Sequence, residues 1–369
     1  MKNARKIFSW IRHEAVLSIA FVCAAASAIF IPPDRGYAEY IDFRVLGTLF
    51  SLMAAVSLLQ LGGAFRILAQ KMLSGEKSTR RVFAELVLLP YFGSMLVTND
   101  VALLSFVPFA VLVLTSLGRT DALGRIVVLQ ALAANLGSMA TPVGNPQNLF
   151  LFSHYSLTAG DFFRLILPFA ALSVLLLLPA LWDGAGTVQV DLPAEAPDRK
   201  KLLAGCGLFA LCLAGVLRLV YWPWVAGTAA ALLFGLDKRI FRRIDWALLA
   251  TFVCFFIFSG NLGRMAPVRG LLEELMQKNA LFAAAAASQV ISNVPAAVLL
   301  APMTENWRAM LLGTDIGGLG TPVASLASLI ALKLYAASPG ARVGRYLLFF
   351  TGMNLLGLLL LLPLAALVG

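Results

Sequence analysis

Two short polar triplets interrupt long apolar stretches of the sequence, one in each half of the chain. They are Thr98-Asn99-Asp100 and Ser292-Asn293-Val294, and a proline follows each asparagine by nine residues. Amide and hydroxyl groups at the end of a broken helix can complete the ligand shell of a small ion, because the freed backbone groups there also need partners. We therefore expect both asparagines to contact a bound small ion.

A second pair of elements follows these triplets in the same order. Residues 135–145 end in Thr-Pro-Val-Gly-Asn, and residues 315–325 end in Thr-Pro-Val-Ala-Ser. A proline stops an incoming helix, and a glycine lets neighbouring backbone approach closely. The broken ends then present partial positive charge or carbonyl oxygens, which suit a small anion or a sodium ion. The residues predicted to bind the substrate are Asn99, Thr141, Pro142, Gly144, Asn145, Asn148, Ser292, Asn293, Thr321, Pro322 and Ser325.

Two carboxylates, Asp100 and Asp315, fall inside these interrupted stretches. Acids at depth in a membrane are costly and usually functional, and a sodium ion and a proton can compete for such a group. The alternative is that each aspartate caps a helix end. We predict a coupling-ion site with a sodium ion at the hairpin tips, and no transition metal, formed by Thr98, Asn99, Asp100, Asn293 and Asp315.

The composition indicates that these elements lie in a membrane. Hydrophobic residues make up 60% of the 369 residues, charged residues only 13%, and the mean hydropathy is +0.86. Soluble domains are nearer half apolar and a quarter charged. The net charge of +10 is spread in short clusters between apolar runs, so it follows the positive-inside pattern and does not indicate nucleic-acid binding.

The apolar runs predict an all-α polytopic membrane protein with two repeats. Each repeat contains a re-entrant helical hairpin, at 83–117 and 281–304, and a discontinuous helix, at 125–156 and 309–337. Residues 1–182 form the first repeat, 183–201 a cytoplasmic linker, 202–220 a linking span and 221–369 the second repeat. Single spans are expected at 15–31, 43–65, 163–182, 202–220, 222–236, 246–262 and 345–367.

The basic residues predict how this path is oriented. The N-terminus carries Lys2, Arg5, Lys6 and Arg12. If it is cytoplasmic, most of the 29 lysines and arginines fall on the cytoplasmic side of the membrane. Positions 75 and 190 are then cytoplasmic, and 160 and 272 lie outside. The first hairpin enters from the cytoplasm and the second from outside, so the repeats are inverted. That arrangement recurs in secondary transporters, and we expect a multi-pass protein of the inner membrane.

The four elements resemble those of the ion transporter superfamily, over about residues 45–365. That group includes arsenite permeases of the ArsB type, sodium/proton antiporters of the NhaD type, citrate transporters and divalent anion/sodium symporters. The resemblance implies a homodimer with elevator-type alternating access. Neither triplet has the Thr found at the third position in the dicarboxylate symporters, and Asp100 is closer to the arsenite and sodium/proton branches.

Several functions stay open on the sequence alone. The preferred one is secondary transport of a citrate-like or arsenite-like anion coupled to sodium or protons, with a sodium/proton antiporter as the alternative and a channel less favoured. An enzyme is not expected, because the chain has no His-Glu-x-x-His or Gly-x-Ser-x-Gly motif. The expected partners are a small ion, the lipid bilayer and a second copy of the chain, and no nucleic acid.

Overall fold

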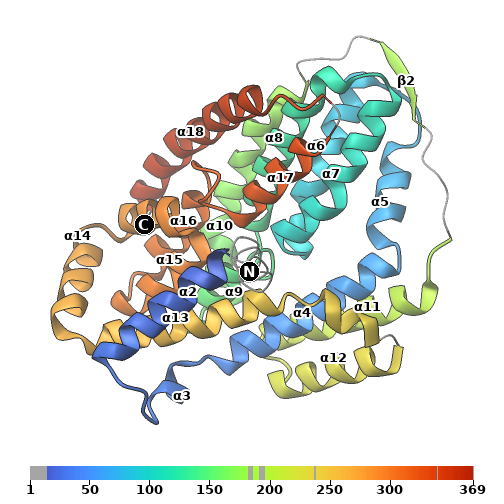
Figure 1. Ribbon diagram of the computed structural model, residues 1–369. Coiled ribbons are helices and arrows are strands. Elements are labelled where there is room, and N and C mark those ends of the chain that lie inside the picture. The colour runs from blue at the N-terminus through green and yellow to red at the C-terminus, as the bar shows by residue number, and fades with distance from the viewer. Residues whose placement is uncertain (1–14, 182–185, 191–195, 237, 339, 369) are drawn as a thin grey trace, which may run out of the picture.

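The computed structural model describes residues 15–181, 186–190, 196–236, 238–338 and 340–368. Nearly all of these residues lie in helices (Figure 1). The predicted single spans correspond to helices α2 (Ala15–Phe30), α4 (Phe43–Leu61), α10 (Ala159–Ser173), α11 (Arg199–Val216), α12 (Trp222–Leu236), α13 (Trp246–Arg264) and α18 (Val343–Val368). The basic residues near the N-terminus that were used to orient the chain lie outside the described residues.

Two of these spans end differently from the sequence prediction. Helix α4 ends at Leu61 instead of residue 65, because Gly63 adopts a left-handed conformation (φ +85°) before α5 (Ala64–Leu73) begins. The span predicted at 163–182 is α-helical only to Ser173 and continues as the 3-10 helix η1 (Val174–Leu181), which contains Pro179. The proline removes one backbone donor from that segment.

The two hairpins form where the polar triplets interrupt the apolar stretches. The first consists of α6 (Thr79–Leu96) and α7 (Asn99–Ser116). The second consists of α14 (Ala266–Ile291) and α15 (Asn293–Leu300), followed by η3 (Ala301–Met303). Helix α14 starts earlier than the predicted arm, but non-helical backbone at Asn279 divides it, and the Asn279 side chain accepts a hydrogen bond from Phe282 N (3.1 Å). The part after this kink corresponds to the predicted arm.

Two helices are broken at the Thr-Pro elements. In the first half α8 (Thr120–Ser138) and α9 (Pro146–His154) are separated by residues 139–145. In the second half α16 (Trp307–Gly317) and α17 (Leu326–Ala336) are separated by residues 318–325. The first helix of each break packs against the hairpin of the same half, α8 on α6 and α7, and α16 on α14 and α15, whereas the second helix packs against the other half, α9 on α15 and α17 on α7.

The remaining helices form a second group. Helix α2 packs on α13, while α4 packs on α11 and α12. Figure 1 shows α4, α11 and α12 below α6, α7 and α8 of the first half. Among the described residues, α4 and α13 begin alike, because Asp42 accepts a hydrogen bond from Val45 N (3.0 Å) and Asp245 accepts one from Leu248 N (2.8 Å). Such caps satisfy backbone donors at helix N-termini.

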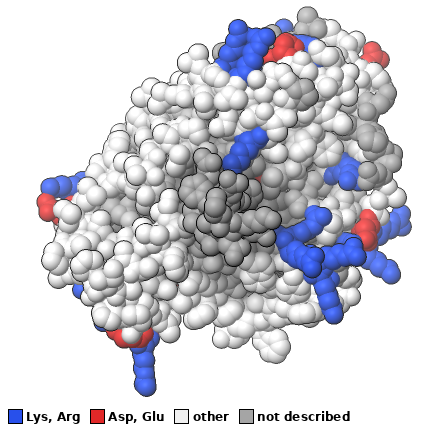
Figure 2. Space-filling model, in the orientation of Figure 1, with Lys and Arg blue, Asp and Glu red and all other residues white. Residues whose placement is uncertain are grey.

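The surface is that of a membrane protein. Five helices among the described residues are long and apolar enough to cross a bilayer, namely Phe43–Leu61, Asn99–Ser116, Ala159–Leu181, Trp246–Arg264 and Val343–Val368. Figure 2 shows that charged side chains gather mainly toward the rims of one face and leave a wide uncharged area. Highly exposed apolar side chains include Phe21, Ile29, Leu203, Trp224, Leu348 and Leu359. The chain is therefore a multi-pass membrane protein.

A short sheet joins two segments that the sequence prediction treated as loops. Strand β1 (Gly75–Ser78) pairs antiparallel with β2 (Thr187–Val190), and Gly75 lies opposite Val190. Strand β2 belongs to the linker predicted at 183–201, of which residues 183–185 and 191–195 lie outside the described residues. Positions 75 and 190 therefore lie on the same side of the molecule, as their shared cytoplasmic assignment requires.

This pairing sharpens a test of orientation. We expect single cysteines at positions 75 and 190, in a cysteine-free background, to react with an impermeant thiol reagent only from the cytoplasmic side. Cysteines at 160 and 272 should react only from outside, because the basic residues divide that way. Labelling of position 272 from the cytoplasm alone would contradict the inverted arrangement of the two hairpins.

Candidate functional site

Each hairpin tip is held against the broken helix of its own half by an equivalent backbone hydrogen bond. Asn99 N donates to Gly144 O (3.3 Å), and Asn293 N donates to Ala324 O (3.0 Å). Each acceptor lies three residues after the threonine of the Thr-Pro element. The two polar triplets therefore meet the two helix breaks, as their matched order in the sequence suggests.

The first break requires its glycine for steric reasons. A Cβ atom at Gly144 would lie 2.2 Å from the carbonyl oxygen of Ser138, which is backbone and cannot move aside cheaply. The Thr141 hydroxyl closes the same turn, since it accepts from Gly144 N (3.1 Å) and donates to Met95 O (2.6 Å). This loop is therefore fixed by its own backbone and by the end of α6.

A small cavity of about 40 Å³ lies where the two tips meet. Its polar lining comes from both halves of the chain, and no lysine or arginine lines it among the described residues. Asp100 supplies the single carboxylate. The amides and hydroxyls that line it belong to Asn99, Gln147, Thr251, Ser292, Asn293 and Ser325. Such a lining can hydrogen-bond a small polar solute, but it offers no protein cation to pair with a multiply charged one.

The two tip asparagines are not equally engaged. Each amide oxygen accepts from the next backbone N–H, Asn99 from Asp100 (3.0 Å) and Asn293 from Val294 (2.9 Å). The Asn99 amide nitrogen also donates to Asn135 Oδ1 (3.0 Å). No hydrogen bond is observed among the described residues for the Asn293 amide nitrogen, and the residue itself lines the cavity. Asn293 therefore has a donor available for a ligand.

The backbone of the second tip is strained. Ser292 has φ +73° and ψ +154°, a region that is essentially restricted to glycine, and its hydroxyl donates to Ala324 O (3.3 Å). A residue held in this region costs on the order of 1–3 kcal/mol and occurs mainly where ligands are clamped. The strain directs both the serine and the following asparagine to the cavity.

Asn135 connects the two halves behind this cavity. Its amide oxygen accepts from Asn99 Nδ2 and from Ser325 Oγ (2.9 Å), and its amide nitrogen donates to Ser328 Oγ (3.0 Å). The side chain is nearly buried at 6% exposure. Polar networks satisfied in this way fix a unique arrangement of the groups that join them.

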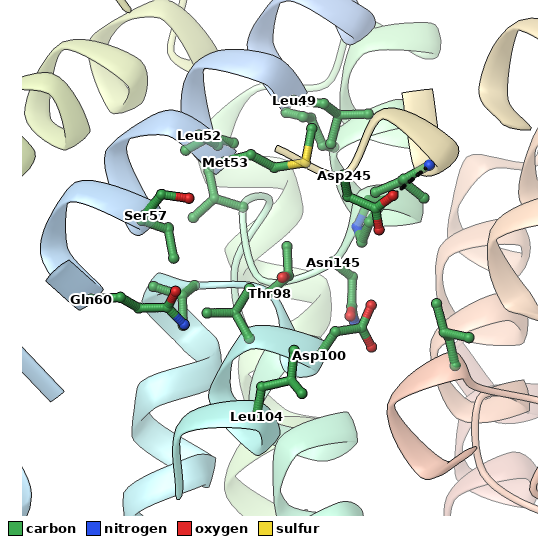
Figure 3. A pocket seen from close by; sticks show the side chains of 18 of the residues that line it. Leu49, Leu52, Met53, Ser57, Gln60, Thr98, Asp100, Leu104, Asn145 and Asp245 are labelled. Atoms are coloured by element: carbon green, nitrogen blue, oxygen red, sulfur yellow. Dashed lines mark hydrogen bonds between the residues drawn. The ribbon is translucent and has the colours of Figure 1, made fainter. Parts of the chain in front are cut away.

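A larger pocket of about 380 Å³ adjoins the small cavity and shares Asp100 with it. Figure 3 shows Asp245, Asn145 and Asp100 along one side of this pocket, with Gln60 across from them. Arg243 also lines it, next to the cap of α13. On the predicted orientation this segment is cytoplasmic, so the pocket would lead from the cytoplasm to the tip of the first hairpin.

The predicted site residues thus fall into two groups. The tip cavity or the adjoining pocket is lined by Thr98, Asn99, Asp100, Asn145, Ser292, Asn293 and Ser325. Neither space is lined by Thr141, Pro142, Gly144, Asn148, Thr321 or Pro322. Thr321 is exposed and binds Gln289 through its backbone N–H (2.9 Å) and its hydroxyl (3.2 Å). In this structure the second group shapes the helix breaks.

The other predicted coupling residue, Asp315, is buried away from the tip cavity at 5% exposure. Its Oδ1 atom accepts from Gln147 Nε2 (3.3 Å), and Asn148 lies beside it. Within the described residues, no group of three or more His, Cys, Asp or Glu side chains is placed to hold a metal ion. The oxygen atoms near Asp315 that could ligate a cation belong to one carboxylate and to the neighbouring side-chain amides.

Three polar residues near the site were not predicted from the sequence. Gln147 reaches Asp315, Gln289 holds the second break through Gly317 O (2.7 Å) and Leu319 O (2.8 Å), and Asp245 lines the larger pocket. One signal was available for Asp245. The segments 41–48 and 244–251 share Ile, Asp, Leu and Thr at equivalent positions, which is a third matched element of the two halves.

Comparisons with known proteins agree with this architecture. A family model described as "Citrate transporter" matches residues 6–327, which include both tips and both breaks. An uncharacterized transporter of Methanocaldococcus jannaschii is 32% identical over 314 residues, 84% of this chain and 85% of that protein. Inner membrane protein YbiR of Escherichia coli is 31% identical over 83% of this chain and 84% of its own. The silicon efflux transporter LSI3 of Oryza sativa is 32% identical over 50% of this chain and 36% of its own.

Proposed function

The chain belongs to the citrate transporter family, and we propose that it is a secondary active transporter of a small inorganic oxyanion or its parent oxyacid. The family and the names of the relatives identify an anion or citrate-type transporter and not an enzyme. The name of YbiR supports an inner-membrane location. The substrate, the coupling ion and the transport cycle are our proposals.

The lining of the tip cavity is the observation that favours a small oxyanion over citrate. The cavity between the tips has a volume of about 40 Å³, and a cavity of about 10–15 Å³ measured in the same way holds one water molecule. The tip cavity can therefore hold a solute of a few heavy atoms. Hydroxyl groups, amide groups and one carboxylate line this space, and no described lysine or arginine does. A tricarboxylate would bring three negative charges to a lining in which the described residues supply no positive side chain. The rice relative named as a silicon transporter is consistent with this substrate class.

We further propose that Asp100 carries the coupling cation. Among the described residues it is the only carboxylate on the tip cavity, and the equivalent residue of the second tip is the uncharged Val294. Its Oδ1 atom is buried without a hydrogen-bond partner among the described residues. A sodium ion or a proton would compensate this charge, and the neutral amides and hydroxyls around it would shape the substrate site.

The packing supports elevator-type movement. The hairpins and broken helices pack mainly on one another, whereas α2, α4, α11, α12 and α13 form a second group. In the proposed cycle the first group moves against the second and carries the tip cavity across the membrane. The homodimer implied by the resemblance stays a prediction of this scheme.

A sodium/proton antiporter is the second candidate, because Asp100 and Asp245 both line the larger pocket. Purified protein in liposomes would separate the two functions. We expect uptake of arsenite-like or silicate-like solutes that saturates and depends on an imposed sodium or proton gradient. Sodium/proton exchange with no uptake of any oxyanion, citrate or dicarboxylate tested would instead establish the antiporter.

A further inference from the structure

One of the differences between the two helix breaks concerns charge. Asn135 and Asp315 each lie six residues before the threonine of the Thr-Pro element. Each side chain reaches across to the other half, Asn135 to Ser325 and Ser328, and Asp315 to Gln147. The chain thus has a neutral amide on one side of this interface and a carboxylate on the other.

The amide is fully satisfied, but the carboxylate is not. Asn135 uses its oxygen for two hydrogen bonds and its nitrogen for a third. Asp315 accepts one long hydrogen bond at Oδ1 (3.3 Å), and its Oδ2 atom is buried without a partner among the described residues. A buried charge left without compensation is strongly destabilising, because the desolvation of the ion is not offset.

Two further oxygens beside Asp315 also lack partners. Gln147 is 1% exposed and Asn148 is fully buried, and neither Gln147 Oε1 nor Asn148 Oδ1 has a hydrogen-bond partner in the described structure. The orientation of Asn148 is set by its nitrogen, which faces Met139 O and Thr141 O (3.3 Å each) at the end of α8. The amide nitrogen of Gln147 faces Asp315, yet one acceptor oxygen on each of these three buried side chains remains without a partner among the described residues.

We propose that Asp315, Gln147 and Asn148 form a buried sodium site that joins the two broken helices, separate from Asp100. One carboxylate and two amide oxygens are hard donors, and a single negative charge suits a monovalent cation better than calcium or magnesium, which usually take several carboxylates. The cation would compensate Asp315 and bind α9 of the first half to α16 of the second. The site stands independently of which solute is transported.

The test uses the full-length protein in the Asp100→Asn background, so that the tip carboxylate contributes no sodium binding. We expect sodium chloride, compared with choline chloride at equal ionic strength and pH 8, to raise the Tm saturably by several degrees. Only a ligand that binds the native state stabilises it in this way. Adding Asp315→Asn should remove the sodium effect, and Gln147→Ala or Asn148→Ala should each weaken the apparent affinity at least about tenfold, roughly one lost ligand contact.

The stability of Asp315→Asn in choline chloride shows whether this variant folds. Asparagine already occupies the equivalent position 135, and Asp315→Asn removes an uncompensated charge, so this variant should be at least as stable as its parent in choline chloride. Asp121→Asn, at an exposed carboxylate paired with Arg119 (3.3 Å), should leave the sodium effect unchanged. A sodium effect that survives Asp315→Asn, or a parent whose Tm responds to pH but not to sodium, would overturn the proposed site.

Discussion

Asn293→Ala is expected to lower transport at limiting substrate concentration by about 10- to 100-fold while leaving the fold intact. Asn293 lines the tip cavity, and no protein hydrogen bond is seen for its amide nitrogen among the described residues. A hydrogen bond to a charged ligand is worth roughly 1.5–3 kcal/mol, so its loss should appear in the affinity for the substrate. Initial uptake rates in proteoliposomes, measured across substrate concentrations, give this value.

Two other variants separate a ligand contact from a structural one. Asn354→Ala removes a buried amide that donates to Phe350 O (2.8 Å) in α18, outside the tip cavity, and should leave transport unchanged. Asn99→Ala should lose stability as well as transport, because its amide nitrogen is bound to Asn135. Misfolding of Asn293→Ala, with loss of a monodisperse purified protein, would show that this asparagine is structural.

Asp100→Asn should end accumulation of substrate against its gradient but leave exchange measurable. The substitution keeps the size of the side chain and its ability to hydrogen-bond, and removes the charge that binds the proposed coupling cation. Asp100 lines both the tip cavity and the larger pocket, so a cation could reach it from the larger pocket. Parallel assays of gradient-driven uptake and of exchange at equilibrium would measure the two activities.

The control for this variant is Asp121→Asn, since Asp121 is exposed and lies outside both spaces. It should retain gradient-driven uptake. If Asp100→Asn concentrates substrate as well as the unmodified protein does, Asp100 is a helix cap and the coupling cation binds elsewhere, with Asp315 as the next residue to examine.

Much of the fold could be predicted from the sequence because a membrane imposes strong patterns. The apolar runs located the spans to within a few residues, and the matched triplets and Thr-Pro elements located both hairpins and both breaks. The differences arise from local chemistry. Gly63 ends α4 early, Asn279 divides α14, and the Gly75–Ser78 strand pairs with a segment of the linker.

The site was harder to predict, because its contacts cross between the halves. The sequence indicated that Asn99, Asp100 and Asn293 stand at interruptions, but not that Gln147 faces Asp315 or that Asn135 binds Ser325 and Ser328. Those contacts depend on how two distant breaks pack. The threonines of the Thr-Pro elements are predicted to bind substrate, and in this structure their hydroxyls donate to backbone carbonyls of the neighbouring hairpin helices, which the sequence did not indicate.

Counterflow tests the central claim, that the two tips form one carrier site exposed alternately to each side. Proteoliposomes loaded with a high concentration of unlabelled oxyanion are diluted into a trace of the labelled one, without an ion gradient. The account predicts a transient rise of internal label above its external concentration, which Asn293→Ala strongly reduces. Label that enters only down to equilibrium, without an overshoot, would contradict a carrier and indicate a channel.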